Sequence, residues 1–331
     1  RREPKARVLL SSQSNVAIDH AFVKVISQMT EHRHSFRAMP QFVRLGNDKI
    51  SENALAWKLE TAVAKWADDM EEQINDNIWH LLENSEPERA MRLTSLFNEW
   101  KDRIKKHDEI KSVYLAQQPL LAGATCAGSH SFIGWKQNFD WVIIDEAGRA
   151  TPPETLIPAL LGSKVVFVGD HKQLPPVIDQ LIESGKRFDR KLLETSLFEE
   201  LFAELPLSVK HTLTMQYRMH PVISDLVSRL FYAETPLESG CGESDRASGI
   251  DWLQPLLWVS TDGRDRSEER NSETSSSFWN EAEVTLIQEL LLKLEKECGA
   301  LRNPKSVAVI TGYSLQKQKL AQAVGLLELP H

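Results

Sequence analysis

An apolar run that ends in two carboxylates, FDWVIIDEAG at residues 139–148, decides the fold of this chain. The run is short, rich in β-branched residues and barely alternating, which is typical of a strand buried on both faces of a parallel sheet. Asp145 and Glu146 follow at the carboxyl edge, where such a sheet meets a ligand crevice. An Asp there can hold Mg²⁺ through water, and a neighbouring Glu can deprotonate an attacking water. A turn followed by a helix start is the open alternative.

Similar apolar runs on both sides of this stretch predict further buried strands. They lie at residues 7–10, 42–46, 120–124, 165–168, 256–259 and 307–310. Helical patterns at 16–26 and 280–296 separate several of them, so the fold class is α/β with parallel sheets. Two stretches rich in Gly, Ser and charged residues, 238–250 and 262–277, predict exposed loops.

Residues 51–118 interrupt this alternation with two apolar stripes of helical spacing. One stripe runs from Leu55 to Leu81 and the other from Leu93 to Ile104, with Pro87 in the first turn after the break. We expect an antiparallel helical hairpin inserted into an α/β domain. The stripes can pack against each other and their own domain, which is the commoner outcome, or mediate coiled-coil dimerisation.

Length and composition exclude several classes of protein. The 331 residues suggest two domains, and 41% apolar with 26% charged residues is ordinary globular usage. No stretch has the apolar length of a membrane helix, so no membrane partner is expected. Three cysteines without C-x-x-C favour a reducing compartment, cytoplasmic or, in a eukaryote, nuclear. The net charge of −8 excludes a uniformly basic nucleic-acid coat, but not a motor whose channel alone is basic.

A second motif, GDHKQLPP at 169–176, follows the predicted strand at 165–168. The strand ends in Gly-Asp and leads into a polar loop that two prolines restrain. The loop places Gln173 where an amide can sense a γ-phosphate or the attacking water. A structural loop glutamine is the alternative for this residue taken singly.

A third motif, QYRMHP, occupies residues 216–221. Tyr217 offers a flat face for a base, and Arg218 offers a fixed fork of donors for phosphate oxygens. The end of a surface strand is the alternative for an isolated Tyr-Arg pair. His220 is most simply a helix-start residue before the proline, and no chemistry is assigned to it.

Together these motifs, in this order and at these separations, resemble the superfamily 1 helicases, in the branch of the RNA-surveillance helicase of nonsense-mediated decay and its bacterial relatives. There they are the Walker B motif, motif III and the opening of the second RecA-like domain. The resemblance extends to SNVAID at 14–19, Thr125-Cys126, SLFE at 196–199 and VITGYSLQ at 309–316, where Gly312 replaces a proline. It implies tandem RecA-like domains at 1–207 and 208–331, both incomplete, with the hairpin 51–118 inserted in the first.

The resemblance also implies roles for single residues, with ATP and Mg²⁺ as cofactors. Those implied in catalysis are Glu146 as general base, Asp145 as a ligand of Mg²⁺ through water, Gln173 as reader of the γ-phosphate and Arg218 as stabiliser of transition-state charge. Those implied in ATP binding are Tyr217, Gln216 and Asp170. Those implied in contacts with phosphates of single-stranded RNA or DNA are Ser14, Asn15 and Thr125.

The phosphate-cradling loop G-x-x-x-x-G-K-[ST] is absent, because Gln180 precedes the Gly185-Lys186 pair and Arg187 follows it. In the family this loop precedes SNVAID and the last motifs follow residues 311–313, so the chain resembles the middle of a helicase core. We expect the chain alone to hydrolyse no ATP and to bind it weakly. For the parent protein we expect ATP-driven movement, 5′ to 3′, on a single strand. A non-hydrolysing nucleic-acid-binding module and an ATPase switch in defence or repair are the alternatives.

Overall fold

The chain divides into two compact units, Arg1–His211 and Thr212–His331, each described by itself. The computed structural model describes residues 6–31, 42–46, 50–83, 85–104, 111, 114–115, 119–178, 191–272, 275–301 and 304–327. The Gly185-Lys186 pair and residues 105–110 of the predicted hairpin lie outside these ranges.

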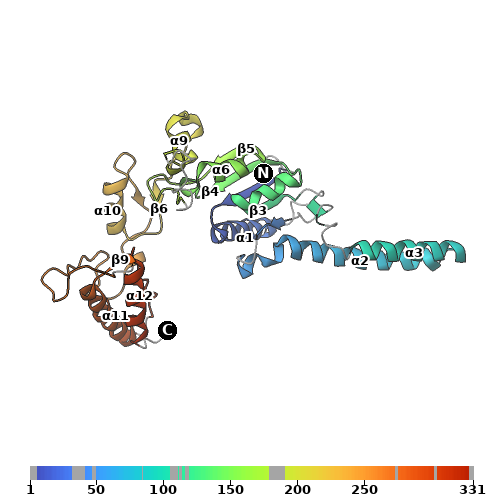
Figure 1. Ribbon diagram of the computed structural model, residues 1–331. Coiled ribbons are helices and arrows are strands. Elements are labelled where there is room, and N and C mark those ends of the chain that lie inside the picture. The colour runs from blue at the N-terminus through green and yellow to red at the C-terminus, as the bar shows by residue number, and fades with distance from the viewer. Residues whose placement is uncertain are drawn as a thin grey trace. The chain divides into compact units, whose positions relative to one another are not determined.

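A five-stranded sheet in the order β2-β3-β1-β4-β5 forms the centre of the first unit (Figure 1). Its strands are β1 Val8–Ser12, β2 Phe42–Arg44, β3 Leu121–Thr125, β4 Phe139–Asp145 and β5 Gly162–Phe167. Every pairing is parallel, and each of the five strands overlaps an apolar run predicted from the sequence. The predicted α/β class with a parallel sheet is therefore confirmed.

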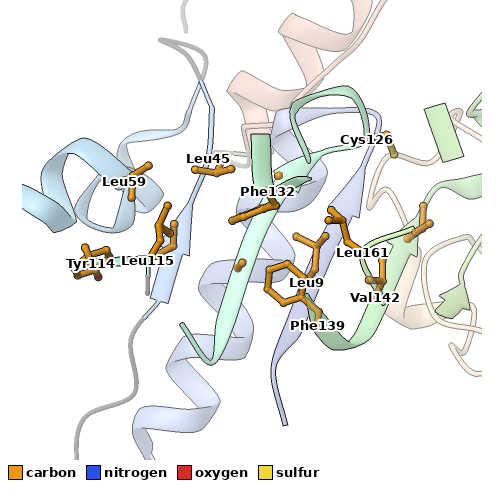
Figure 2. Packing of buried hydrophobic residues seen from close by; sticks show 14 of the residues in the cluster. Leu9, Leu45, Leu59, Tyr114, Leu115, Cys126, Phe132, Phe139, Val142 and Leu161 are labelled. Atoms are coloured by element: carbon orange, nitrogen blue, oxygen red, sulfur yellow. The ribbon is translucent and has the colours of Figure 1, made fainter. Parts of the chain in front are cut away.

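Both faces of the sheet are covered over β1, β2 and β3, whose residues are nearly all buried. The expectation of full burial is wrong for β4, which alternates between buried residues and intermediate or exposed ones, and for β5, whose residues are all intermediate or exposed. Leu9 belongs to the main core cluster, whereas its neighbour Leu10 packs into a second cluster with Phe22. Successive strand residues point to opposite faces, so the two clusters lie on opposite sides of the sheet. Figure 2 shows the main cluster, in which the Phe132 ring meets the edge of the Phe139 ring at 5.2 Å between centroids.

The helical segments of the first unit include the predicted helix after β1 and the two predicted helices of the hairpin, with several shorter segments that were not predicted. They are α1 Asn15–Glu31, η2 Glu52–Trp57, α2 Leu59–Glu83, α3 Pro87–Ile104, η3 Ala127–Ser129, α5 His130–Gly134, η4 Ala147–Arg149, α6 Pro152–Ala159, α8 Lys191–Glu194, α9 Leu197–Glu204 and η5 Leu207–Val209. In Figure 1, α2 and α3 lie side by side, and Lys101 Nζ lies 2.9 Å from a Glu71 carboxylate oxygen across them. Leu59 and Val63 of α2 enter the main core, so the hairpin packs against its own domain.

The second unit contains short strands and longer helices. Its elements are β6 Met215–Gln216, α10 Pro221–Phe231, β7 Glu238–Ser239, η6 Ser244–Arg246, β8 Arg270–Ser272, β9 Ser275–Trp279, α11 Glu281–Leu301 and α12 Ser314–Gly325. β6 pairs with β7 in parallel, and β8 pairs with β9 antiparallel. α11 contacts α12 through the buried Gln316 side chain, whose Nε2 donates to Glu283 Oε2 at 2.9 Å.

Two expectations for the second unit are wrong. The runs at 256–259 and 307–310 are not strands, and Trp258 and Ile310 are 92% and 90% exposed. A parallel strand needs a neighbouring strand for its hydrogen bonds, and within the described ranges neither run has one. Neither predicted loop is only loop. Residues 238–250 contain β7 and η6, and β8 pairs with β9 within 262–279, where the Arg270 guanidinium lies over the Trp279 ring.

None of the helices among the described residues is long and apolar enough to cross a membrane.

Candidate active site

Asp145 and Glu146 lie at the carboxyl end of β4, where the backbone turns sharply. Glu146 adopts a left-handed conformation with φ 55° and ψ 33°, and its N–H donates to Asp145 Oδ1 at 3.0 Å. That conformation costs a non-glycine residue about 1 kcal/mol, and such strain concentrates at functional sites. The Glu146 side chain is exposed and Asp145 is half-buried. The turn thus presents both carboxylates at the sheet edge.

Two glycines bring the segment after β4 against the segment after β5. A Cβ on Gly148 would lie 2.8 Å from the Asp170 carbonyl oxygen, and a Cβ on Gly169 would lie 2.8 Å from the Gly148 nitrogen. The Ala147 N–H donates to the Val168 carbonyl at 2.9 Å. Only residues without a side chain allow two backbones to approach so closely. The DEAG and GD motifs are therefore one contiguous structure.

The Asp170 carboxylate organises the loop that carries Gln173. Its Oδ1 accepts the Lys172 N–H at 3.0 Å, and its Oδ2 accepts Gln173 Nε2 at 2.9 Å. The Gln173 side chain is exposed, and its hydrogen bond to Asp170 is the contact that sets the direction of its amide. His171 anchors the loop through its ring, 5.1 Å from the Phe202 ring of α9.

Ser12 lies at the same edge and was not among the predicted site residues. It ends β1, and the register pairs it with Thr125 on one side and Asp145 on the other. Its side chain is 1% exposed, and its hydroxyl has no hydrogen-bond partner among the described residues. A buried hydroxyl of this kind commonly bonds a water or an ion-bound water. The sequence did contain a signal for this residue, because the polar pair Ser11-Ser12 directly follows the apolar run of β1.

Two residues predicted to contact nucleic acid start helical turns at this edge. The Ser14 hydroxyl accepts the Ala17 N–H at 3.1 Å, which caps α1 after β1. The Thr125 hydroxyl accepts the Gly128 N–H at 3.0 Å after β3. Because β1 and β3 are adjacent and parallel, both turns emerge on the same edge as Asp145.

The third such residue, Asn15, is connected to a buried ion pair. Asn15 Oδ1 accepts Arg44 Nη2 at 2.9 Å, and Arg44 Nε donates to Asp19 Oδ1 at 2.7 Å. Arg44 and Asp19 are 0% and 1% exposed. Burial lowers the pKa of Arg44, and its hydrogen bond with Asp19 opposes that shift. Sequence reasoning missed this pair, although an arginine within an apolar strand was a visible signal.

Cys126, which follows Thr125, is a structural residue. Its thiol is buried and accepts the Ser11 hydroxyl at 3.6 Å. Burial raises the pKa of Cys126 to about 11, so the thiol stays protonated near neutral pH. This excludes Cys126 as a nucleophile there.

In the second unit, the Gln216 amide holds the turn that contains Tyr217 and Arg218. Gln216 Oε1 accepts the Arg218 N–H at 2.9 Å and the Met219 N–H at 2.7 Å. Its Nε2 donates to the Met219 carbonyl at 3.1 Å and to the Ser239 hydroxyl at 2.8 Å. The side chain therefore shapes the loop.

The turn leaves Tyr217 and Arg218 accessible. The Tyr217 ring is 65% exposed, and the exposed Arg218 guanidinium has no partner within the described part of the chain. His220 caps α10, because its Nδ1 accepts the Val222 N–H at 3.2 Å. The expectation that His220 is a helix-start residue is confirmed.

The structure thus gathers the predicted site residues of the first unit at one sheet edge, and Tyr217, Arg218 and Gln216 in one turn of the second. Within the described ranges, no group of three or more His, Cys, Asp or Glu residues could hold a metal ion. A site with a single carboxylate such as Asp145 suits Mg²⁺, which keeps several waters and takes its other ligands from phosphates. The chemistry of the donors therefore fits Mg²⁺ bound together with a nucleotide.

Comparison with known proteins identifies relatives of both units. Residues 1–180 match one AAA domain family and residues 193–328 match a second. The ATP-dependent helicase upf1 of Schizosaccharomyces pombe is 30% identical over 97% of the chain and 32% of its own length. The 5'-3' DNA helicase ZGRF1 of Mus musculus is 29% identical over 98% of the chain and 16% of its own length. Regulator of nonsense transcripts 1 of Caenorhabditis elegans is 30% identical over 96% of the chain and 27% of its own length.

The chain spans a third or less of the length of these relatives. Two successive AAA domains support tandem RecA-like domains, as the resemblance implied. The first of these families covers more than half of the chain, so the chain belongs to this AAA domain family, and its likeness to upf1 and to Regulator of nonsense transcripts 1 supports a superfamily 1 helicase of the RNA-surveillance type.

Proposed function

We propose that the chain is the core of an ATP-dependent helicase or translocase that moves 5′ to 3′ on single-stranded RNA or DNA. The observation that carries this proposal is the backbone contact of Gly148 with Asp170, which joins the two carboxylates after β4 to the amide loop after β5. A water-activating carboxylate and an amide that senses a γ-phosphate must act on the same atoms. One rigid edge that carries both suits hydrolysis of a nucleoside triphosphate.

The residues of the first unit then divide the work of hydrolysis. Mg²⁺, held by Asp145 through water, would offset the charge of the phosphates. The exposed Glu146 carboxylate accepts the proton of the attacking water. Asp170 engages Gln173 Nε2, which leaves the Gln173 carbonyl oxygen to orient that water. The buried Ser12 hydroxyl, which pairs in register with Asp145, would donate to a water of a Mg²⁺ ion held there.

The second unit contributes recognition of the nucleotide and stabilisation of charge. The exposed Tyr217 ring stacks on the base, and Arg218 donates to phosphate oxygens in the transition state. Gln216 acts through the turn that it holds. With the proposed domain bounds of 1–207 and 208–331, the carboxylates and Gln173 belong to the first domain, and Tyr217 and Arg218 belong to the second.

Contacts with the single strand come from the turns after β1 and β3. Helix-start N–H groups near Ser14 and Thr125, with the Asn15 amide, suit phosphate oxygens, which these groups bind regardless of base sequence. We also place the protein in a reducing compartment, cytoplasmic or nuclear, because Cys126, Cys241 and Cys298 are unpaired.

The test is nucleic-acid-stimulated ATP hydrolysis by the full-length protein and by two variants. Glu146→Gln removes the general base and should lower kcat by at least about 100-fold while ATP binding persists. Glu200→Gln alters an exposed carboxylate on α9 and should leave kcat unchanged. ATP binding without turnover in the unaltered protein would favour a non-hydrolysing nucleic-acid-binding module. An equal loss in both variants would contradict the role of Glu146.

A further inference from the structure

The segment from Glu238 to Arg246 lies beside the turn that carries Tyr217. β7 pairs with β6 so that Ser239 lies opposite Gln216, and the Gly240 N–H donates to the Gln216 carbonyl at 2.8 Å. The Gln216 side chain also donates to the Ser239 hydroxyl at 2.8 Å. Two backbone strands and one side chain thus fix the residue immediately before Tyr217.

Two side chains of the same segment donate to the backbone of Tyr217 itself. Arg246 Nη2 lies 2.6 Å from the Tyr217 carbonyl oxygen, and Cys241 Sγ lies 3.0 Å from it. A carbonyl oxygen has two lone pairs, so both acceptor positions of Tyr217 are occupied. The peptide plane that follows the ring is therefore held from two directions.

Gly240 sets the position of the ring. A Cβ placed on Gly240 would lie 2.3 Å from Tyr217 Cε1, 2.7 Å from Cδ1 and 2.8 Å from Cζ. Cβ atoms essentially never approach other atoms so closely, so any side chain here would displace the ring. The ring lies against bare backbone on one side and is 65% exposed overall.

We infer that Gly240, Cys241 and Arg246 are positioning residues that hold the Tyr217 ring as a preorganised platform for the nucleotide base. This inference rests on the proposed role of Tyr217 in base stacking. A ring that is already in place loses less freedom when a base binds, so preorganisation raises affinity without a new contact. The three residues act through Tyr217 and touch no substrate.

The test compares alanine substitutions at two glycines of the same loop in the full-length protein. Gly240→Ala displaces the ring, whereas a Cβ on Gly242 meets nothing nearer than 3.5 Å. Both glycines have backbone angles that alanine adopts, so the difference between the variants isolates the contact with the ring. We expect Gly240→Ala to raise KM for ATP about tenfold, the size of one base-stacking contact, with little change in kcat. Gly242→Ala should match the unaltered protein.

A double variant separates positioning from a general loss of structure. In a Tyr217→Ala background the ring is gone, so Gly240→Ala should raise KM no further than Tyr217→Ala alone. Arg246→Ala as a single variant should raise KM for ATP, and it should raise KM no further when Tyr217→Ala is already present. Additive effects would overturn the inference, as would an unchanged KM in Gly240→Ala when Tyr217→Ala raises it. An unchanged KM in Tyr217→Ala would instead overturn the base-stacking role itself.

Discussion

Removing the carboxylate of Asp19 should destabilise the first unit severely, because it leaves a buried charge without a partner. The Arg44 guanidinium is 0% exposed, and Asp19 is the acidic residue that it meets, at 2.7 Å. Breaking a buried ion pair from one side costs about 3–5 kcal/mol. Asp19 Oδ2 also accepts the Ser51 N–H at 2.7 Å, and losing that bond adds about 1 kcal/mol. Against a typical total stability of about 5–15 kcal/mol, Asp19→Ala should leave the unit marginally folded.

The assay is urea denaturation of the 331-residue chain, followed by hydrogen exchange so that each unit is observed separately. Peptides from residues 8–31 should lose protection at a lower urea concentration, whereas peptides from 281–301 should be unaffected. Glu99→Ala is the matched control in the first unit, because the Glu99–Arg103 pair is exposed and 3.4 Å long. Exposed pairs of this kind contribute about 0.2–1 kcal/mol.

A compensating variant makes the reasoning refutable. Asp19→Leu with Arg44→Met replaces the pair with apolar side chains, and such replacements of buried pairs are often neutral or stabilising. The double variant should therefore be more stable than Asp19→Leu alone. A cost below about 1 kcal/mol for Asp19→Ala would show that the pair does not hold the unit together. A double variant as unstable as the single one would show that burial of the charge is not the cause.

Three further predictions concern the sheet edge. Gly148→Ala should lower the free energy of unfolding by about 1–3 kcal/mol and lower kcat, because its Cβ would meet the Asp170 carbonyl oxygen at 2.8 Å. Gly134→Ala is the control: its Cβ meets nothing within 4 Å, so melting and ATPase assays should show no change. Because burial raises the pKa of Cys126 from 9.0 to about 11, the unfolded thiol ionises first as pH rises. The resulting stability is intact below pH 9 and is lost between pH 9 and 11, by about 3 kcal/mol. Cys126→Ala should make the loss of stability at alkaline pH smaller in urea titrations, and the part due to the raised pKa of Tyr114 should remain. Ser12→Ala deletes a buried hydroxyl that has no partner among the described residues, so the free energy of unfolding should not fall. The Mg²⁺ concentration that gives half-maximal ATP hydrolysis should rise, and an unchanged Mg²⁺ dependence would contradict the role proposed for Ser12.

The sequence predicted those helices and strands whose formation follows from the pattern of apolar residues within the segment itself. The five strands of the first unit and the helices α1, α2, α3 and α11 coincide with apolar runs or helical stripes. β1, β2 and β3 are covered on both faces and must therefore be largely apolar, and a helix with one buried face must repeat every three or four residues. The same local logic identified His220 as a helix-start residue.

Local patterns failed where pairing depends on distant residues. The runs at 256–259 and 307–310 have the composition of buried strands, yet in the described ranges no neighbour pairs with them. A second failure concerns a local pairing: the polar residues 270–272 pair antiparallel with 275–279, in a register that places Arg270 opposite Trp279. Strand propensity largely reports side-chain burial against neighbours, which a single segment does not contain.

The candidate site shows the same division between sequence and structure. The sequence by itself determined which residue types stand after β4 and β5 and in the QYR turn, because the motifs are contiguous. Only the tertiary structure decided that Gly148 lies against Asp170, that Arg44 is buried on Asp19 and that Gly240 lies against the Tyr217 ring. The partners in these contacts are separated by about 20 or more residues. Chain folding alone brings them together, and close packing leaves no room for another side chain between them.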